Sequence, residues 1–217
     1  MSRSSEIYDD FQRSNRVLDG FWRVYGTLGE ASAHIVSERV EQADYPFAFY
    51  AEAVLPRTPH RISAQFSLLG TNGPNCGPVI LMSGDGIRVQ HYLNMIHFVV
   101  VPGLWTLNVY EDDVPSDNIA TGTHNLALDG SVYTFGLRPK GGDTIVLELP
   151  DGTERTLTDN RFVGRIGRYV SIESYAHPGF GQDVVPRFEA VTISVTRAEC
   201  ERTAAVNRST AGTRTAV

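Results

Sequence analysis

Apolar residues recur at every second position through most of the chain, which is the period of a half-buried β-strand. The alternation is complete over residues 61–68, where one face carries Ile62, Ala64, Phe66 and Leu68. The same alternation recurs at 47–54, 105–110, 133–137, 144–149, 169–175 and 188–195. Strands with one apolar and one polar face are typical of antiparallel sheets. The pattern predicts roughly a dozen such strands.

Turn sequences separate these segments. Glycine-containing turns occur at Asn72-Gly73-Pro74, Gly84-Asp85-Gly86, Pro102-Gly103, Asp129-Gly130, Lys140-Gly141-Gly142 and Asp151-Gly152. The last two bracket one short strand, so residues 132–157 are predicted to form a meander. The polar segment 111–123 is predicted to be a long loop, and the best helix candidate is 197–205.

This succession of strands favours an all-β fold, namely a two-sheet antiparallel sandwich of jelly-roll type. We expect the sandwich to span residues 1–196. Residues 197–217 are expected to form a C-terminal extension, as a short helix or a tail that serves assembly or as a linker. From residue 201 on, the composition changes to mainly Arg, Thr, Ala and Ser.

Composition and charge exclude several classes of partner. The chain has 217 residues, of which 41% are hydrophobic, and its net charge is −6. Nucleic-acid binding needs a basic face, and docking on anionic lipid does too, so neither partner is expected. The two cysteines, Cys76 and Cys200, are too few for a zinc site. Whether they pair in a disulfide or stay as thiols is left open by the sequence.

The chain begins without an apolar stretch, so we expect no signal peptide. Apolar runs such as Phe98–Val101 are far shorter than the ~20 residues that span a bilayer. Synthesis in a cytoplasm is therefore expected. A protein of this kind that acts outside the cell would leave as part of a larger particle.

Residues 8–25 resemble the opening of the concanavalin A-like jelly rolls found in actinobacteriophage minor tail proteins. That opening has Asp-Phe-Asn-Arg, a spacer, Leu-Gly and then Trp, and the matching positions here are Asp10, Phe11, Arg13, Leu18 and Trp22. Gln12 stands where Asn is usual. The resemblance covers about residues 7–196 and supports the jelly-roll fold.

The resemblance also implies roles for particular residues. Phe11 and Trp22 would anchor the first strands in the core, and Asp10 with Arg13 would hold the loop between them. A closing strand that contains residues 187–193 would pair with the first strand. Because this architecture occurs in lectins, glycosidases, lyases and phage adhesins, the fold alone does not select a function.

Motifs for catalysis are missing from the sequence. It has no Glu-x-Asp-x-x-Glu strand of retaining glycosidases and no Gly-x-Ser-x-Gly. Gln90-His91 differs from the Gln-x-His of alginate lyases because adjacent residues lie on opposite faces of a strand. Glu52 and Glu173 are the only outward-facing strand carboxylates to nominate for an enzyme. His91 and His97 would meet across a hairpin, but satisfied polar residues at a strand edge are the default interpretation.

Two predicted strands carry aromatic and planar polar side chains on their outward faces, as a sugar-binding sheet needs. The glycan-binding candidates are Arg88, Gln90, Tyr92, Tyr169, Glu173 and Tyr175. The alternative is an ordinary solvent-facing surface. Asp112, Asp113 and Asp117 lie in an oxygen-rich segment and are weak calcium candidates. A solvated acidic loop is the default there, and no cofactor is expected.

These observations favour a non-enzymatic structural or adhesive module, namely a phage minor tail or virion-associated protein that binds cell-surface glycan. Its partners would be other tail subunits or its own copies in a homo-oligomer, together with a cell-surface polysaccharide. One alternative is a glycan hydrolase or lyase of the same fold. Another is a cytoplasmic carbohydrate-binding protein of a bacterium.

Overall fold

The computed structural model describes residues 4–14, 16–17, 20–26, 33–36, 38–42, 49–70, 76–86, 94–111, 114–176 and 184–196. These residues form sixteen strands and one 3-10 helix, η1 (Asn160–Phe162). No helix in this described part of the chain is long and apolar enough to cross a membrane. The predicted helix at 197–205, the rest of the extension and Cys200 lie outside the described residues. Cys76 is buried.

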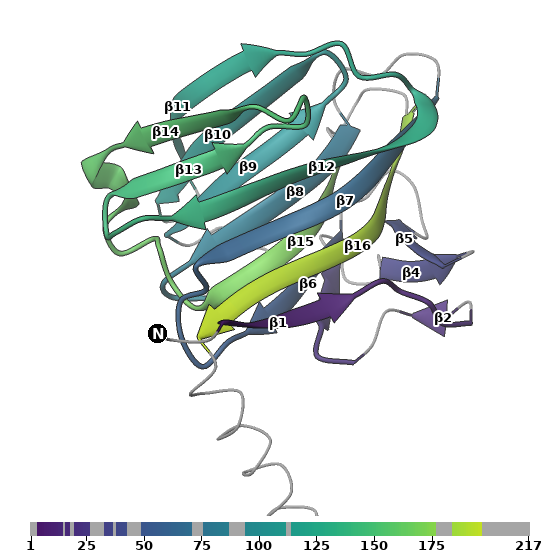
Figure 1. The fold of residues 1–217 in the computed structure, drawn as a ribbon, viewed down its shortest axis with the longest axis horizontal. Coiled ribbons are helices and arrows are strands. Elements are labelled where there is room, and N and C mark those ends of the chain that lie inside the picture. Colours follow the sequence, from purple (N-terminus) through teal and green to yellow (C-terminus); the bar gives the residue numbers. More distant parts are fainter. Residues whose placement is uncertain are drawn as a thin grey trace, which may run out of the picture.

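The strands form two sheets, and every strand pair among the described residues is antiparallel. The nine-stranded sheet has the order β14 (Glu154–Thr158), β13 (Thr144–Glu148), β12 (Asp129–Pro139), β7 (Arg61–Gly70), β16 (Val184–Thr196), β5 (Arg39–Gln42), β4 (Ala33–Val36) and β2 (Arg16–Val17), and β1 (Ser4–Asp9) also pairs with β16. The seven-stranded sheet has the order β11 (Val114–Thr123), β10 (Leu104–Glu111), β9 (Met95–Val101), β8 (Cys76–Ser83), β15 (Tyr169–Ala176), β6 (Phe49–Val54) and β3 (Arg23–Gly26). The sheets stack as two layers (Figure 1), which confirms the predicted sandwich.

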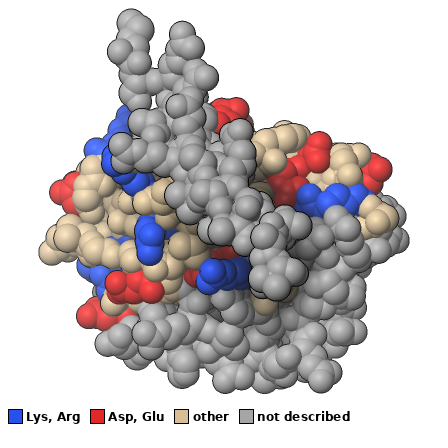
Figure 2. Space-filling model, turned by 90° about the horizontal axis from the view of Figure 1, so that it is seen from below, with Lys and Arg blue, Asp and Glu red and all other residues tan. Residues whose placement is uncertain are grey.

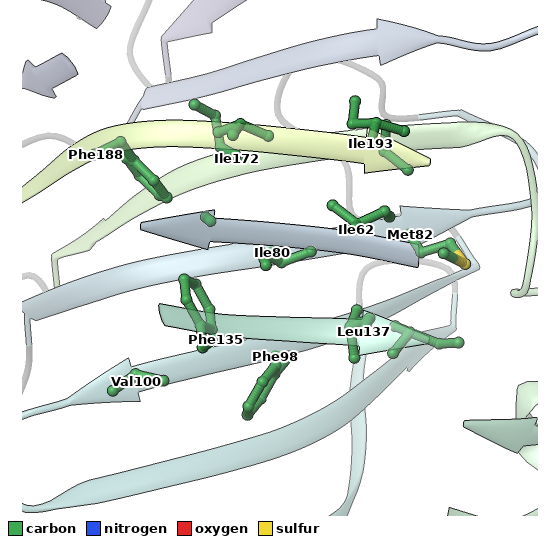
Figure 3. Packing of buried hydrophobic residues seen from close by; sticks show 14 of the residues in the cluster. Ile62, Ile80, Met82, Phe98, Val100, Phe135, Leu137, Ile172, Phe188 and Ile193 are labelled. Carbon is green, nitrogen blue, oxygen red and sulfur yellow. The ribbon is translucent and has the colours of Figure 1, made fainter. Parts of the chain in front are cut away.

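The core lies between the two layers and is built from the alternating apolar residues that the sequence pattern predicts. Ile62 and Phe66 of β7 are buried in it, as expected. The ring of Phe135 lies 5.1 Å from that of Phe66 and 5.4 Å from that of Phe98, measured between centroids. Since Phe98 belongs to the opposite sheet, its contact with Phe135 joins the layers (Figure 3).

The predicted loop at 111–123 is wrong, because Val114–Thr123 is the strand β11, which pairs antiparallel with β10. Among the described strands, β11 lies at the edge of its sheet and pairs only with β10. An edge position tolerates Pro115 and the polar residues around it, since half of the backbone groups need no partner strand. Register shifts next to Asn108 further interrupt the ladder. The polar composition therefore marks an edge strand rather than a loop.

The two ends of the sandwich sequence meet as predicted. β1 pairs with β16 along its whole length, from Ser4 opposite Thr196 to Asp9 opposite Val191. Phe11 is fully buried and Trp22 is 6% exposed, which confirms their place in the core.

The loop after β1 is held by Asp9 and not by Asp10 as the resemblance implied. The buried Asp9 carboxylate accepts hydrogen bonds from the Arg13 guanidinium at 2.9 and 3.0 Å and from the Trp22 indole N–H at 3.0 Å. It also accepts from the backbone N–H of Phe11 at 3.0 Å, where φ is +56°. The outward-turned Asp10 accepts only a local bond from Gln12 among the described residues. Strand alternation explains the difference, since consecutive aspartates face opposite sides.

His124 is expected to make folding stability depend on pH. Its Nε2–H donates to the carbonyl oxygens of Val101 at 2.8 Å and Leu104 at 3.2 Å, while Nδ1 accepts from the N–H of Leu126. Burial lowers the pKa of His124 below its usual 6.5. As the pH falls, the His124 ring therefore takes up a proton in the unfolded chain before it does so in the folded chain. The stability that the neutral ring provides is lost as pH falls from 6.5 toward the folded-state pKa.

The measurement is the unfolding free energy of the wild type and of His124→Gln at pH 7.5 and pH 5. The wild-type advantage should shrink at the lower pH, because glutamine does not titrate. An advantage of equal size at both pH values would contradict this assignment.

Candidate functional site

The outer face of the seven-stranded sheet carries a row of residues that the strand register aligns. Across β6, β15, β8, β9 and β10 the row consists of Glu52, Ser171, Leu81, His97 and Asn108. Directly opposed residues share one face of a sheet, so this row faces away from the core. Parity also places Tyr169 and Glu173 on this face, as predicted from the sequence.

The carboxylates on this face are buried, although the sequence analysis expected solvent-exposed ones. Glu173 is 0% exposed and Glu52 is 3% exposed. The assumption of one solvated face fails here, because a second cluster of buried apolar residues shares this face, formed by Val79, Leu81, Met95, Val99 and Val101 with Tyr110 packed against it. β8 and β9 are thus apolar on both faces. Their near-continuous apolar sequences were the available signal, since such strands are buried on both sides.

Glu173 forms a buried pair with His97. His97 Nε2 lies 3.4 Å from Glu173 Oε2, and the imidazole is 2% exposed. The His97 ring also lies 5.4 Å from the Tyr110 ring, measured between centroids. The sequence suggests only His91 as a partner for His97. The contact with Glu173 spans β8 and joins residues far apart in the chain, so local pattern does not predict it.

Glu52 and Glu173 are diagonal neighbours on adjacent strands, because Ser171 lies directly opposite Glu52. Such positions are separated by roughly 7–8 Å between Cα atoms. The Ser171 hydroxyl donates to the Ala51 carbonyl oxygen at 2.9 Å and so packs closely against β6. The arrangement is a tightly packed acidic and imidazole cluster within an apolar face.

Several predicted site residues cannot be placed. Arg88, Gln90 and Tyr92 lie outside the described residues, and so does His91. The same holds for the side chain of Tyr175. Of the calcium candidates, Asp112 and Asp113 are outside the described residues, and Asp117 is described only in its backbone. Among the side chains that the structure describes, no three His, Cys, Asp or Glu residues lie together as a metal site would require.

Tyr169 opens β15 and presents a half-buried ring at the end of this face. A β-carbon at Gly86 would lie 3.2 Å from the ring, so the ring rests directly on the glycine backbone, where φ is +93°. The Arg168 guanidinium carbon lies 5.1 Å from the ring centroid, and its Nη2 donates to the Tyr169 hydroxyl at 3.2 Å. The ring and the guanidinium thus orient each other.

The turn below Tyr169 is organised by the buried Ser83 hydroxyl. This hydroxyl donates to the Asn94 carbonyl oxygen at 2.8 Å and accepts from the N–H groups of Asp85 at 3.1 Å and Gly86 at 3.2 Å. The Asn94 amide donates to the Asp85 carboxylate at 3.0 Å. Polar groups next to the Tyr169 ring therefore stand on a hydrogen-bonded frame.

An open groove of about 480 Å³ lies at this end of the sandwich, where three connections between strands meet. It is lined by Arg57, Thr58, Gly84, Ile166, Gly167 and Arg168. A β-carbon at Gly167 would lie 2.3 Å from the Gly84 Cα atom, so the backbones of two connections touch in its floor. The Leu55 N–H donates to the Arg168 carbonyl oxygen at 3.0 Å and ties in the third connection.

The connection from β14 to β15 is anchored by Arg165. Its buried guanidinium donates to the carbonyl oxygens of Tyr110 at 3.0 Å and Arg161 at 2.7 Å, and to the Glu111 carboxylate at 3.2 Å. At the start of η1, the Arg161 guanidinium lowers the pKa of Asp159 to about 2. These interactions hold residues 159–168 across the end of the sandwich.

Comparisons with known proteins show what this fold is similar to. No protein-family model and no curated protein sequence matches the chain. Among solved structures, lectin I-B4 from Griffonia simplicifolia in a metal-free form has a TM-score of 0.58 at 13% identity, with 88% of this chain and 99% of that chain covered. The exoplasmic/lumenal domain of VIP36 with Ca²⁺ and mannose has a TM-score of 0.62 at 10% identity, with 88% and 89% covered.

A third similar structure comes from work on endo-acting O-glycanases that prominent members of the human gut microbiota express. Its TM-score is 0.61 at 11% identity, and the match covers 88% of this chain and 98% of that chain. The TM-scores show a shared fold, the concanavalin A-like β-sandwich of lectins. At identities this low, the similarity shows the fold alone. Both binding proteins and enzymes use this fold, so function has to be argued from the residues of this chain.

Proposed function

We propose that this chain is a non-catalytic carbohydrate-binding module that binds glycan at the end of the seven-stranded sheet where Tyr169 lies. The observation that carries the proposal is the Tyr169 ring, which is held on Gly86 and against Arg168 with part of its surface accessible. A fixed aromatic ring offers a surface for the apolar face of a sugar. Asp85 and Asn94 supply carboxylate and amide groups nearby for sugar hydroxyls.

The similarity of the fold to lectins supports this proposal, since one similar VIP36 structure has mannose bound. The burial of Glu52 and Glu173 favours binding over glycan hydrolysis. The two catalytic carboxyl groups of a glycosidase must reach the scissile bond from its two sides. Here both carboxylates are buried on a face that also carries a buried apolar cluster, whereas accessible polar groups such as Asp85 lie at the end of the sheet.

The biological setting that we propose is a phage minor tail or another virion-associated position, with the module attached to tail subunits or to its own copies. The resemblance of residues 8–25 to minor tail proteins supports this setting. Mass spectrometry of purified particles tests it, with the peptide of residues 62–88 that ends at Arg88 as one tryptic marker. Calcium dependence is tested separately by repeating glycan binding with EDTA, and no step of the proposed binding uses the metal.

Tyr169→Ala is expected to weaken glycan binding by about tenfold or more, because removing a central aromatic contact at a binding site typically costs more than 1 kcal/mol. The measurement is a glycan array with the full chain, followed by calorimetric titration of the best ligand. Tyr8→Ala is the matched control, since Tyr8 is an exposed tyrosine on β1 of the opposite sheet. Equal affinities of the Tyr169 variant and the wild type would exclude this site.

A further inference from the structure

An apolar pocket of about 200 Å³ opens between the two layers of the sandwich. Ile7 of β1 and Val195 of β16 form the wall that belongs to the nine-stranded sheet, and Ala53 and Leu55 form the wall at the end of β6 in the seven-stranded sheet. Figure 2 shows the molecule from below the view of Figure 1, the side on which β1 lies. Acidic and basic side chains of the described residues are interspersed there, so the apolar pocket and not one sign of charge marks a ligand site.

The pocket lies where β6 extends beyond its neighbour β3. The first residue of β3, Arg23, lies opposite Glu52, and β6 continues from there to Val54. Phe21, which precedes β3, is in a turn and lines the pocket together with Val54. The end of β6 therefore borders the pocket on the side where β3 has not yet begun.

Two exposed apolar side chains form the rim of the pocket. Phe21 is 41% exposed and Val54 is 37% exposed, whereas Leu55 and Val195 are each 3% exposed. The Phe21 ring lies 4.6 Å from the ring of the buried Trp22, measured between centroids, so the rim rests on the core. Exposed apolar side chains that are grouped on a surface often mark a binding site.

The rim adjoins the proposed glycan site. Val54 lies directly opposite Tyr169 on the paired strands β6 and β15, so the two side chains share one face of the sheet. The Cβ atoms of such a pair are roughly 4.5–5.5 Å apart. The Leu55 N–H donates to the Arg168 carbonyl oxygen at 3.0 Å, which fixes the pocket wall to the strand end that carries Tyr169. A ligand that lies on the Tyr169 ring therefore reaches the pocket by extending past Val54.

The pocket has room for a small apolar group. An apolar cavity of about 150 Å³ in a protein core binds benzene. The volume of about 200 Å³ therefore holds a six-membered ring or an alkyl chain of similar size. Each methylene group that moves from water into such a lining should tighten binding by about fourfold.

We propose that this pocket binds an apolar substituent of the glycan, namely an aryl or alkyl group attached to the sugar that lies against Tyr169. The buried walls take up the substituent, and Phe21 and Val54 contact it where it enters. This inference rests on the proposed glycan-binding function and names its ligand class as glycans that carry an apolar substituent.

The first experiment tests the pocket without any sugar. Methyl NMR spectra of the full chain are recorded while benzene is added. The methyl signals of Ile7, Leu55 and Val195 should shift, whereas those of Leu69 should not, because Leu69 is an exposed leucine on β7 of the other sheet. Unchanged signals from the pocket residues would overturn the inference.

The second experiment compares glycosides that share one sugar and differ in the attached group. Methyl, butyl, hexyl and phenyl glycosides of glucose, galactose, mannose and N-acetylglucosamine are titrated into the full chain by calorimetry. In at least one series the hexyl or phenyl form should bind about tenfold or more tightly than the methyl form. No gain in any series, including no binding at all, would overturn the inference. The proposed function is decided separately, by Tyr169-dependent binding of unsubstituted glycans on the array.

Variants of the pocket assign the gain in affinity to it. Phe21→Ser should remove most of the gain and leave the affinity for the methyl form nearly unchanged, and Ala53→Leu should do the same by filling the pocket from its wall. Leu69→Ser is the matched control for Phe21→Ser, since both side chains are 41% exposed. Circular dichroism checks that each variant is folded. A gain that persists in the folded Phe21 and Ala53 variants would place the substituent elsewhere and overturn the inference.

Discussion

Asp9→Ala is expected to destabilise the fold by about 3–5 kcal/mol, the cost typical of removing one partner from a buried charged network. Asp9 is 5% exposed and accepts four hydrogen bonds, from the Phe11 backbone, two Arg13 nitrogens and the Trp22 indole. Without the carboxylate, the guanidinium and the indole N–H both lose a partner close to the core. Phe11 also loses the contact that supports its positive φ.

The measurement is urea unfolding, with Asp10→Ala as the matched control. Asp10 is the adjacent aspartate, and its carboxylate makes one local bond to the Gln12 N–H among the described residues. We expect its loss to cost less than about 1 kcal/mol, as is usual for residues outside such networks. Asp9→Asn should fall between the two, since the amide keeps the shape and loses the charge. Equal effects of the two alanine variants would refute the assignment of the loop anchor to Asp9.

The period-two pattern predicted the sandwich because burial between two sheets acts on every second residue of a strand. Ile62, Ala64, Phe66 and Leu68 all lie in the core as their alternation indicated. The meander also followed from a local signal, namely the glycine turns, whereas the pairing of the first and last strands was implied by the resemblance to concanavalin A-like jelly rolls.

The pattern failed where the assumption of one solvated face did not hold. Glu173 was placed on the correct face, yet periodicity reports the side of the sheet and not what covers that side. Glu173 is buried on a face that also carries the buried residues Val79 of β8 and Val99 of β9. The contact of Glu173 with His97 crosses an intervening strand, so it requires the strand order, which alternation does not contain.

The groove illustrates a third limit of the sequence. Arg57 and Arg168 lie in connections more than a hundred residues apart, and they share a groove because β6 pairs with β15. The Gly84-Asp85-Gly86 motif was identified only as a turn, whereas in the fold it supports the Tyr169 ring and closes the groove floor. Turn glycines that allow close backbone contact are a signal for such a site, but the contacting partner appears only in three dimensions.

Glu173→Leu is the second substitution with a large expected effect, a loss of about 3–5 kcal/mol of unfolding free energy. It removes a fully buried carboxylate from beside His97 Nε2 and leaves the enclosed imidazole without that partner. His97→Leu should destabilise for the reciprocal reason. Replacing both residues by leucine should cost less than the sum of the single changes, because the outer cluster around them is apolar and accepts an apolar pair.

Urea unfolding of the wild type, the two single variants and the double variant forms a double-mutant cycle. It should give a coupling free energy of more than about 1 kcal/mol between Glu173 and His97, as expected for residues in contact. Glu148→Leu is the matched control, since Glu148 pairs with Arg61 at 2.8 Å on the outer face of the other sheet and both side chains are partly exposed. Its loss should cost about 1 kcal/mol or less, as for surface ion pairs.

Because Glu173 lies apart from the accessible groove, the double variant should keep its affinity for glycan. Strict additivity of the two single effects would show that Glu173 and His97 are not coupled, and loss of glycan binding in the folded double variant would move the binding site to this cluster.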